Sequence, residues 1–458
     1  MPSDRPHAVI GCAANKVAIG RPPGHPGPQV PPTHAASNLS GPRVKVAIAV
    51  HGTRGDIEPA GAVALELLRR GHQVNLAVPP NLLEFAASAG LPAAVSYGVD
   101  SHQQLDADLF RDLHTVRNPV TVLRESQEYI AQGYPEMSET LAELAADADL
   151  ILTGTTYQDV AGNVAEYHDI PLAALHYFPF RANRQLLAVP IPLPMPVVKR
   201  GFAVVEWGHW RLSKKAEDAQ RVSLGLPPAT VRSTRRMQDR GALEIQAYDE
   251  VLFPGLSAEL GPDKPLVGSM SMQLSTDTDT DVMAWIADGT PPIYFGFGSM
   301  PVQAPADAVA MIGRVCAELG ERALISAGVW DLDDLPADRH VKVVGPVNHA
   351  AVFPRCRVLV HHGGAGTTAA GVRSGVPAVV LWVSADQPVW ANRIDRLKLG
   401  AAHRFSSTNE RVLGKALRTA LRPDYQMRAR AAATRMVQPA DSAARTADLL
   451  EQAVRGRA

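Results

Sequence analysis

A glycine-rich stretch in the second half of the chain combines residue types that bind phosphate. Residues 358–366 read VLVHHGGAG and are followed by Thr367 and Thr368. The apolar letters predict a buried strand, the glycines allow a ligand to approach the backbone closely, and a helix is predicted directly afterwards. Because the first amides of a helix lack internal partners, the stretch favours an anion, to which His362 and the threonine hydroxyls can also donate. A tight turn with Thr367 as a mere helix cap is the alternative.

A second candidate lies in the loop after the first apolar run. Residues 44–50 (VKVAIAV) predict a buried parallel strand, and the turn HGTRGDIE follows it. Asp56 in this turn lies beyond the carboxyl end of a strand, where parallel α/β folds bind their ligands. A carboxylate there can take the proton of a hydroxyl nucleophile, since an ordinary Asp with a pKa of about 3.9 is ionised at neutral pH. The alternative is that Asp56 only caps the helix, which we expect to begin near Pro59.

Other charged side chains are predicted to have structural or solvent-exposed roles and no part in the chemistry. Arg54 can approach a phosphate or pair with a surface carboxylate, and we expect the second. We expect His51, next to the loop, to be structural. Three alternating carboxylates in a polar stretch are expected to be solvated linker charges with no metal role: Asp277, Asp279 and Asp281.

The elements around both loops alternate between strand and helix. A helix over 60–70 and a strand over 73–78 complete one β-α-β unit, and the alternation resumes after a Ser/Thr-rich linker at 269–281. Such alternation predicts parallel sheets with helices on both faces, and ligands beyond the carboxyl ends of the strands. Further strands are predicted over 150–153, 172–175, 292–297, 323–326, 341–344 and 378–382, and further helices over 136–146, 306–319 and 367–374.

The composition narrows the function classes. The chain has 458 residues, of which 46% are hydrophobic and 20% charged, and its formal net charge is -1. This length allows two or three domains, and the charge balance favours neither nucleic acid nor a membrane. Three cysteines without metal-ligand spacing favour a reducing cytoplasm. The longest uncharged apolar run, residues 186–198, contains four prolines and is too short to span a bilayer.

Several motifs occur together in a fixed order. Residues 361–366 (HHGGAG), residues 375–377 (GVP) and the pair Asp386-Gln387 resemble the donor-binding signature of the family 1 glycosyltransferases. Residues 52–59 (GTRGDIEP) are similar to the N-terminal loop of the sterol and glycopeptide branches of this family, and the letters FGFGSM to its first C-terminal strand and loop. The resemblance therefore touches both halves of the chain and is loosest in the middle.

The resemblance implies the GT-B fold, an α/β fold with two doubly wound Rossmann-like domains facing a cleft. Residues 43–265 would form the acceptor-binding domain and residues 266–435 the nucleotide-sugar-binding domain, followed by a helical tail at 436–458. Residues 1–42 are expected to be a disordered N-terminal extension, because residues 21–32 are rich in Pro and Gly.

The resemblance also implies roles for single residues. Asp56 matches the position of the family's proposed catalytic base. Asp386 and Gln387 would hold the sugar hydroxyls. Val347 and Asn348 would lie on the side of the nucleobase, without the aromatic residue that plant members stack on the base. The donor diphosphate would be bound by Thr53, Ser299, His362, Gly364, Gly366 and Thr367.

The implied reaction is inverting transfer of a hexose from a UDP- or dTDP-sugar to a hydroxyl of a lipophilic acceptor. The letters LWVSADQP are similar to actinobacterial enzymes that glycosylate glycopeptidolipids, so a glycolipid of that kind is expected. No metal and no other cofactor is expected. A sterol, polyketide, macrolide or glycopeptide glucosyltransferase is the alternative within the class. Outside it, a non-catalytic sugar-nucleotide-binding helper is the alternative, and the Asp56 loop disfavours an epimerase.

A basic region in the first half of the chain gives information about the chemical class of the acceptor. Between residues 199 and 240 there are ten Lys or Arg against four Asp or Glu, close to Phe202, Trp207 and Trp210. Basic groups beside aromatics suit an anionic membrane surface or a lipid-linked acceptor. The alternative interpretation of this region is a helix whose aromatic residues lie in the core and whose arginines are solvated. We therefore expect a cytoplasmic protein, with peripheral contact at the inner membrane face as the additional alternative.

Overall fold

The computed structural model describes most of the chain after residue 42. The described residues are 43–101, 131–186, 193–272, 274–276, 278–296, 298, 305–327 and 340–456. The expected disordered extension 1–42 and the expected phosphate ligand Ser299 lie outside them. In the part of the chain that is described, no helix is both long enough and apolar enough to cross a membrane.

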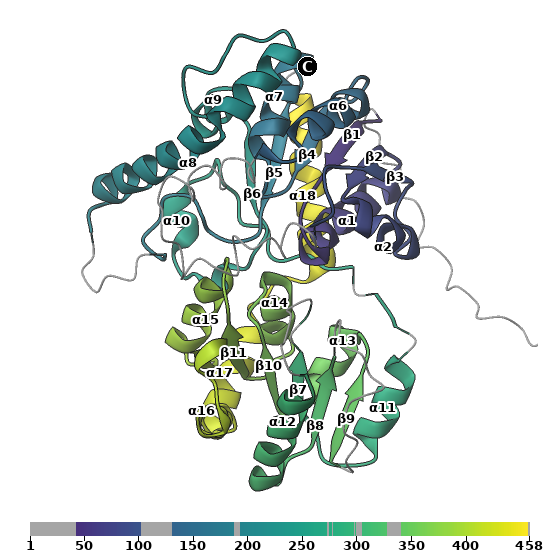
Figure 1. Ribbon diagram of the computed structural model, residues 1–458, viewed down its shortest axis with the longest axis vertical. Helices are drawn as coiled ribbons and strands as arrows, with labels where there is room; N and C mark the ends of the chain where they lie inside the picture. Colours follow the sequence, from purple (N-terminus) through teal and green to yellow (C-terminus); the bar gives the residue numbers. More distant parts are fainter. Residues whose placement is uncertain are drawn as a thin grey trace, which may run out of the picture. The chain divides into compact units, whose positions relative to one another are not determined.

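Two parallel six-stranded sheets form the framework (Figure 1). Their strand orders are β3-β2-β1-β4-β5-β6 and β9-β8-β7-β10-β11-β12. Each is the order of a doubly wound fold, in which the chain changes direction beside the first strand of the half. The predicted α/β class with two Rossmann-like domains is confirmed. The strands are β1 (Lys45–Ala49), β2 (Gln73–Val78), β3 (Ala94–Ser96), β4 (Leu150–Thr153), β5 (Leu172–His176), β6 (Leu243–Gln246), β7 (Ile293–Gly296), β8 (Ala323–Ser326), β9 (Val341–Val344), β10 (Val358–His361), β11 (Ala378–Trp382) and β12 (Gly400–Arg404).

Helices flank both sheets (Figure 1). In the N-terminal half they are α1 (Arg54–Arg69), α2 (Leu83–Ser88), α6 (Tyr134–Leu144), α7 (Gln158–His168), α8 (Met195–Ser223), α9 (Ser233–Asp239) and α10 (Leu256–Leu260). Later in the chain they are α11 (Asp279–Ala287), α12 (Pro305–Leu319), α13 (His349–Val352), α14 (Ala365–Arg373), α15 (Gln387–Arg396), α16 (Glu410–Ala420), α17 (Pro423–Ala433) and α18 (Pro439–Arg455).

Alternate residues of the central strand β1 face two separate cores. Val46 and Ile48 pack in a cluster that includes α1 and α18. Ala47 and Ala49 pack in a second cluster that includes α6 and α7. Burial on both faces explains why the central strands are continuous apolar runs that the sequence predicts well. The three strands that the pattern misses, β3, β6 and β12, all lie at sheet edges, where a strand does not need to be apolar throughout.

α1 begins earlier than predicted, and α11 forms where no helix was predicted. α1 starts at Arg54 with Thr53 at its N-cap, so Pro59 lies inside the helix. A capping box between Thr53 and Asp56 stabilises this earlier start. α11 starts at Asp279, inside the stretch predicted as a linker, and the Asp279 carboxylate accepts from the amides of Thr276 at 2.7 Å and of Asn348 at 2.8 Å. The prediction that Asp279 is a solvated linker charge is therefore wrong. Asp281 also lies in α11 and pairs with Lys342 at 2.8 Å. Asp277 lies outside the described residues.

One buried carboxylate ties together the two places where the chain passes between the sheets. Oδ2 of Asp249, just after β6, accepts from the amide and the hydroxyl of Ser269, both at 3.0 Å, on the outward passage. Oδ1 accepts from the amide of Val437 at 2.7 Å on the return. Arg373 donates to the Ser269 hydroxyl at 2.6 Å and lies 3.7 Å from Asp249. After the return, α18 packs on α1 and completes the N-terminal core.

Removing this carboxylate should destabilise the protein. We expect Asp249→Ala to lower the free energy of unfolding by about 3 kcal/mol, because two amides and a half-buried guanidinium lose their partner. Thermal unfolding followed by circular dichroism measures the effect, with the exposed Asp263→Ala as the matched control. Equal unfolding midpoints for the two variants would contradict the role given to Asp249.

Candidate functional site

Asp56 lies in the first turn of α1, directly beyond the carboxyl end of β1. Its Oδ2 accepts from the amide of Thr53 at 2.7 Å and from the Thr53 hydroxyl at 3.1 Å. Asp56 thus caps its own helix, but neither bond uses Oδ1. Burial raises the pKa of Asp56 to about 6 although the Thr53 bonds oppose the rise, and the charge of Asp386 adds to it. A carboxylate with a pKa near neutrality is suited to accept a proton.

Two side chains that the sequence analysis did not single out hold this loop. The hydroxyl of Tyr177, just beyond β5, donates to the carbonyl oxygen of Asp56 at 2.8 Å. The hydroxyl of Thr156, beyond β4, donates to the carbonyl oxygen of His51 at 2.6 Å. Both residues follow correctly predicted strands. Polar side chains beyond the carboxyl ends of neighbouring parallel strands are the signal that could have found them.

The other charged groups of the loop have the structural roles that the sequence predicts. His51 is buried, its Nε2 lies 3.0 Å from the carbonyl oxygen of Val99, and burial lowers its pKa. Arg54 pairs with Glu58 one turn along α1, with 2.7 Å between Nε and Oε1. The side chain of Thr53 is engaged with Asp56, so this predicted phosphate ligand lies at the N-cap of α1 with its hydroxyl donating inside the loop.

The glycine-rich loop after β10 makes room for an imidazole at a helix N-terminus. Gly364 is the N-cap of α14, and Gly363 has a φ of 94°, which favours glycine. A Cβ at Gly364 would lie 2.7 Å from Nε2 of His362, and one at Gly298 would lie 3.0 Å from its Cε1. The ring therefore occupies space that only glycines leave. Because the first amides of α14 lack helical partners, the arrangement can bind an anion.

The first turn of α14 contains the remaining residues predicted to bind phosphate. Gly366 is exposed, and a Cβ placed there would meet no described atom within 4 Å. Thr367 follows it, half-buried. The neighbouring Thr368 instead donates its hydroxyl back to the carbonyl oxygen of Gly364 at 2.9 Å, so it belongs to the helix. The structure thus brings Gly364, Gly366 and Thr367 together with His362 in one loop and turn.

Three histidines influence one another at this end of the second sheet. His361 is buried, and its Nδ1 accepts from the amide of Gly363 at 3.1 Å. His349 stacks on Phe353, with ring centroids 4.2 Å apart. Burial lowers the pKa of His361 to about 3 and that of His349 to about 4, and it also lowers the pKa of His362. At neutral pH these rings are therefore uncharged hydrogen-bond donors. Across the described residues, no three His, Cys, Asp or Glu side chains are grouped to hold a metal ion.

Asp386 and Gln387 lie beside the glycine-rich loop, at the start of α15. The Trp390 indole donates to Oδ2 of Asp386 at 2.8 Å, and burial raises the pKa of this carboxyl. Oε1 of Gln387 accepts from the amide of Val383 at 2.8 Å. A Cβ at Gly363 would lie 3.5 Å from the Cβ of Gln387. Oδ1 of the carboxylate and the NH₂ of the amide are the groups that could bind sugar hydroxyls.

The residues predicted on the nucleobase side are engaged within the protein. Val347 is buried in a hydrophobic cluster with Tyr294 and Phe353. Asn348 is the N-cap of α13, and its Oδ1 accepts from the amide of Ala350 at 2.9 Å. Their assignment to the nucleobase stays a prediction.

Charges from the two halves act on each other. The carboxylate of Asp386 contributes to the raised pKa of Asp56, and the guanidinium of Arg54 contributes to the lowered pKa of His349. Ala365, the first residue of α14, packs against the hydrophobic cluster of the N-terminal sheet. The predicted base, the Asp-Gln pair and the glycine-rich loop therefore share one electrostatic environment, which is where two reactants could meet.

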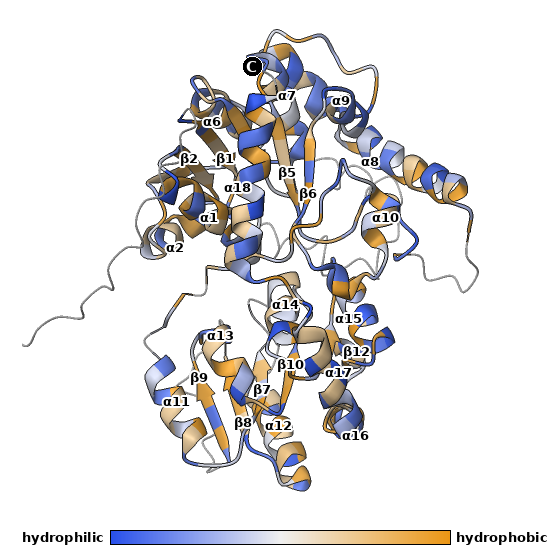
Figure 2. Ribbon diagram, turned by 180° about the vertical axis from the view of Figure 1, so that it is seen from behind, coloured by the Kyte–Doolittle hydropathy of each residue, from blue (hydrophilic) through white to orange (hydrophobic). Residues whose placement is uncertain are grey.

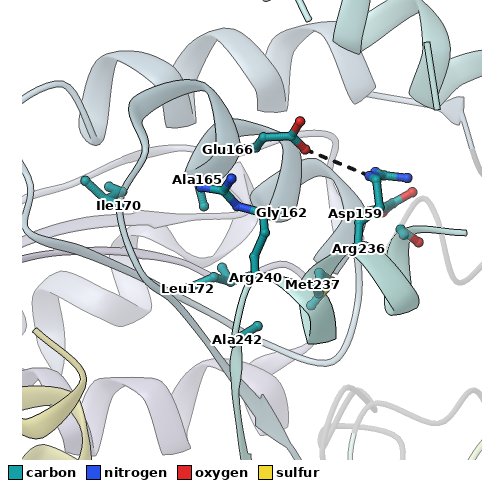
Figure 3. A pocket seen from close by; sticks show the side chains of 11 residues that line it. Asp159, Gly162, Ala165, Glu166, Ile170, Leu172, Arg236, Met237, Arg240 and Ala242 are labelled. Atoms are coloured by element: carbon teal, nitrogen blue, oxygen red, sulfur yellow. Dashed lines mark ion pairs between the residues drawn. The ribbon is translucent and has the colours of Figure 1, made fainter. Parts of the chain in front are cut away.

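A pocket between α7 and α9 lies away from these residues (Figure 3). Its charged walls are paired with each other or with neighbours: Arg236 pairs with Glu217 and lies 3.9 Å from Glu166, and Arg240 pairs with Asp169 at 2.9 Å. We interpret this pocket as a packing space inside a polar network. Arginines that the sequence analysis assigned to a basic patch are thus engaged, and Arg232 and Arg235 also have carboxylate partners, Glu206 at 3.2 Å and Asp239 at 2.9 Å.

Comparison with known protein families assigns most of the chain. Residues 46–146 match the glycosyltransferase family 28 N-terminal domain. Residues 312–452 match the erythromycin biosynthesis protein CIII-like C-terminal domain. The uncharacterized glycosyltransferase Rv1524 of Mycobacterium tuberculosis is 55% identical over 413 residues, 90% of this chain and 99% of that protein. The vancomycin aglycone glucosyltransferase of Amycolatopsis orientalis is 31% identical over 422 residues, 90% of this chain and 98% of that protein.

Solved structures agree with this assignment. The calicheamicin glycosyltransferase CalG4 has a TM-score of 0.69 at 17% identity, covering 90% of this chain and 98% of that one. The glycosyltransferase VinC, solved in complex with dTDP, has a TM-score of 0.62 at 17% identity, covering 90% of this chain and 100% of that one. Identities this low show the fold alone, whereas the sequence relatives show the family. The protein is a glycosyltransferase of family 1 and has the GT-B fold.

Proposed function

We propose that this glycosyltransferase moves a sugar from a dTDP- or UDP-sugar to a hydroxyl of a lipophilic acceptor, with inversion and without a metal ion. The observation that carries the proposal is Asp56, a carboxylate of raised pKa at the carboxyl end of β1, within electrostatic reach of Asp386 beside the glycine-rich loop. A base from one half and a sugar-binding carboxylate from the other are what a direct displacement between donor and acceptor requires.

The proton transfer uses Oδ1, the oxygen of the Asp56 carboxylate that does not bond to Thr53. The acceptor hydroxyl would donate to Oδ1, while the Thr53 bonds hold Oδ2 and fix the orientation of the group. As the acceptor oxygen attacks the anomeric carbon, its proton passes to Asp56 and the bond from that carbon to the diphosphate breaks on the opposite face. One displacement inverts the configuration, and the nucleoside diphosphate leaves with the electron pair.

The leaving group would be stabilised by the start of α14. The unpaired amides after Gly364 and the neutral imidazole of His362 donate hydrogen bonds to the phosphate oxygens, which develop negative charge as the sugar departs. Oriented donors of this kind act where charge develops and do not require a metal. The complexes of VinC with dTDP and of SsfS6 with thymidine diphosphate support a dTDP-sugar as the first donor to test.

The acceptor is proposed from the resemblance of residues 381–388 (LWVSADQP) to enzymes that glycosylate glycopeptidolipids. A lipid-linked acceptor implies a cytoplasmic enzyme in peripheral contact with an anionic membrane. The 31% identity to the vancomycin aglycone glucosyltransferase favours a second candidate, a soluble peptide or polyketide aglycone. Transfer of labelled sugar from dTDP-rhamnose and UDP-glucose into a bacterial lipid extract, beside a panel of such aglycones, separates the two acceptors.

Asp56→Asn should abolish most of the transfer while leaving the donor site intact. We expect kcat to fall by about 10²- to 10⁴-fold, the usual contribution of a general base, with unchanged affinity for dTDP by calorimetry. Glu58→Gln on the same helix is the matched control and should retain activity. If Asp56→Asn transfers sugar as fast as the wild type, Asp56 is not the base.

The raised pKa of Asp56 predicts an acid limb in the rate profile. Because the base must be ionised, kcat/KM should fall as the pH drops through about 6, instead of through the ordinary Asp range near 4. Asp56→Glu should keep an acid limb, and Asp56→Asn should lose it from its residual activity. A wild-type profile that is flat down to pH 5 would contradict the assignment.

His362→Ala should weaken donor binding in particular. The loss of one hydrogen bond to a charged phosphate costs about 1.5 kcal/mol, so the Kd for dTDP should rise by about tenfold. His403→Ala on β12, outside the site, is the control. Calorimetry with dTDP measures both variants, and equal affinities would remove His362 from the phosphate site.

A further inference from the structure

The first half of α8 presents apolar side chains to solvent. A Cβ placed at Gly201 or at Gly208 would meet no atom within 4 Å, so the described residues do not cover this part of the helix. Figure 2 shows hydrophobic and hydrophilic residues interleaved along α8. Large apolar side chains gathered on one uncovered element mark an interaction surface. Their exposed fractions are 47% for Val197, 68% for Val204, 72% for Val205 and 54% for Trp207.

Basic side chains share this face. Arg200, Arg211 and Lys215 are exposed, and with Val197 and Val204 they follow one another at spacings of three, four or seven residues, which places them on one side of a helix. In the described part of the chain, no ion pair engages any of the three cations. The acidic residues of α8 are engaged elsewhere: Glu206 with Arg232, Glu217 with Arg236, and Asp218 with Lys214.

We propose that this α8 face, consisting of Val197, Arg200, Val204, Trp207, Arg211 and Lys215, docks on an anionic lipid surface. An apolar stripe with a tryptophan, flanked by cations and with the nearest carboxylate, Asp218, already paired with Lys214, is the chemistry of a helix that lies in the headgroup region of a membrane. The inference deepens the proposed function and rests on it for the lipid acceptor, which the docked enzyme would meet in the membrane plane.

The charges of the α8 face favour an anionic lipid surface over a second copy of the chain as the partner of this face. A two-fold interface would bring Arg200, Arg211 and Lys215 of both copies together without a carboxylate between them, and like charges in contact are unfavourable. An anionic surface instead neutralises every cation at once. Arg232, Arg235 and Arg236 belong to the same basic region at residues 199–240 but do not take part in this surface, because they are paired within the protein.

Vesicle flotation of the full chain, without donor or acceptor, tests the proposal. The probes are phosphatidylcholine vesicles with and without phosphatidylglycerol. The charge variant is Arg200→Gln/Arg211→Gln/Lys215→Gln, and the apolar variant is Val204→Ser/Trp207→Ser. The matched control removes three exposed cations from α16: Arg411→Gln, Lys415→Gln and Arg418→Gln. Binding of dTDP by each variant reports whether the protein is folded.

We expect the wild type and the α16 variant to float with anionic vesicles only, and to be released by salt. The charge variant should partition roughly 100-fold less, because each basic residue near an anionic surface contributes about 1 kcal/mol. The apolar variant should also bind less, with its dTDP affinity unchanged.

Equal binding by the α8 and α16 charge variants, or no vesicle binding by the wild type, would overturn the proposal. So would binding of the α8 face to an acidic protein in the absence of vesicle binding. Sugar transfer is measured separately: normal vesicle binding without any transfer to lipid would count against the proposed acceptor and leave the docking surface in place.

Discussion

The change of chain direction beside the first strand of each sheet is the constraint on which the site depends. Between β1 and β4, and again between β7 and β10, successive connections leave in opposite directions, so the carboxyl ends of these strands are not covered by a crossing segment. The loop of Asp56 follows β1 and the glycine-rich loop follows β10. In both halves a helix then begins at the same edge, and the first amides of a helix, which lack helical partners, lie where a ligand can approach from outside the sheet.

The cap that Asp56 forms on α1 is compatible with the base role proposed for it, so the two roles need not be alternatives. Through Oδ2 it caps α1, and this fixes its position at the edge of the sheet. The same position partly buries it and brings it under the influence of Asp386, and its pKa rises to about 6. The cap hydrogen bonds keep this rise moderate. A carboxylate that remains ionised at neutral pH but binds a proton more tightly than an ordinary Asp is well suited to general base catalysis.

Two sets of polar contacts fix the chain where it passes between the sheets and where α18 returns to the N-terminal half. Asp249 engages both passages of the chain, and Arg70 on α1 donates to the carboxylates of Asp448 and Glu451 on α18, at 2.6 Å and 2.9 Å. These bonds hold the last helix of the chain against the first. Because Asp56 lies on α1, the last helix also supports the helix that carries the candidate base.

Local patterns in the sequence were sufficient to predict the central strands, the glycine-rich loop and the family. Continuous apolar runs such as residues 150–153 and 378–382 predict their strands residue by residue, because a strand buried on both faces must be apolar at every position. The motif residues His362, Asp386 and Gln387 could be named from their order alone.

Tertiary contacts determined the features that no local pattern predicts, namely an edge strand, the pairing of a basic side chain and a shifted pKa. The polar edge strand β6 (LEIQ) forms because it pairs with β5, Arg236 is withdrawn from the surface by Glu217, and the pKa of Asp56 depends on a charge 330 positions away. Burial and long-range charge are properties of neighbours in space, and no pattern along the chain contains them.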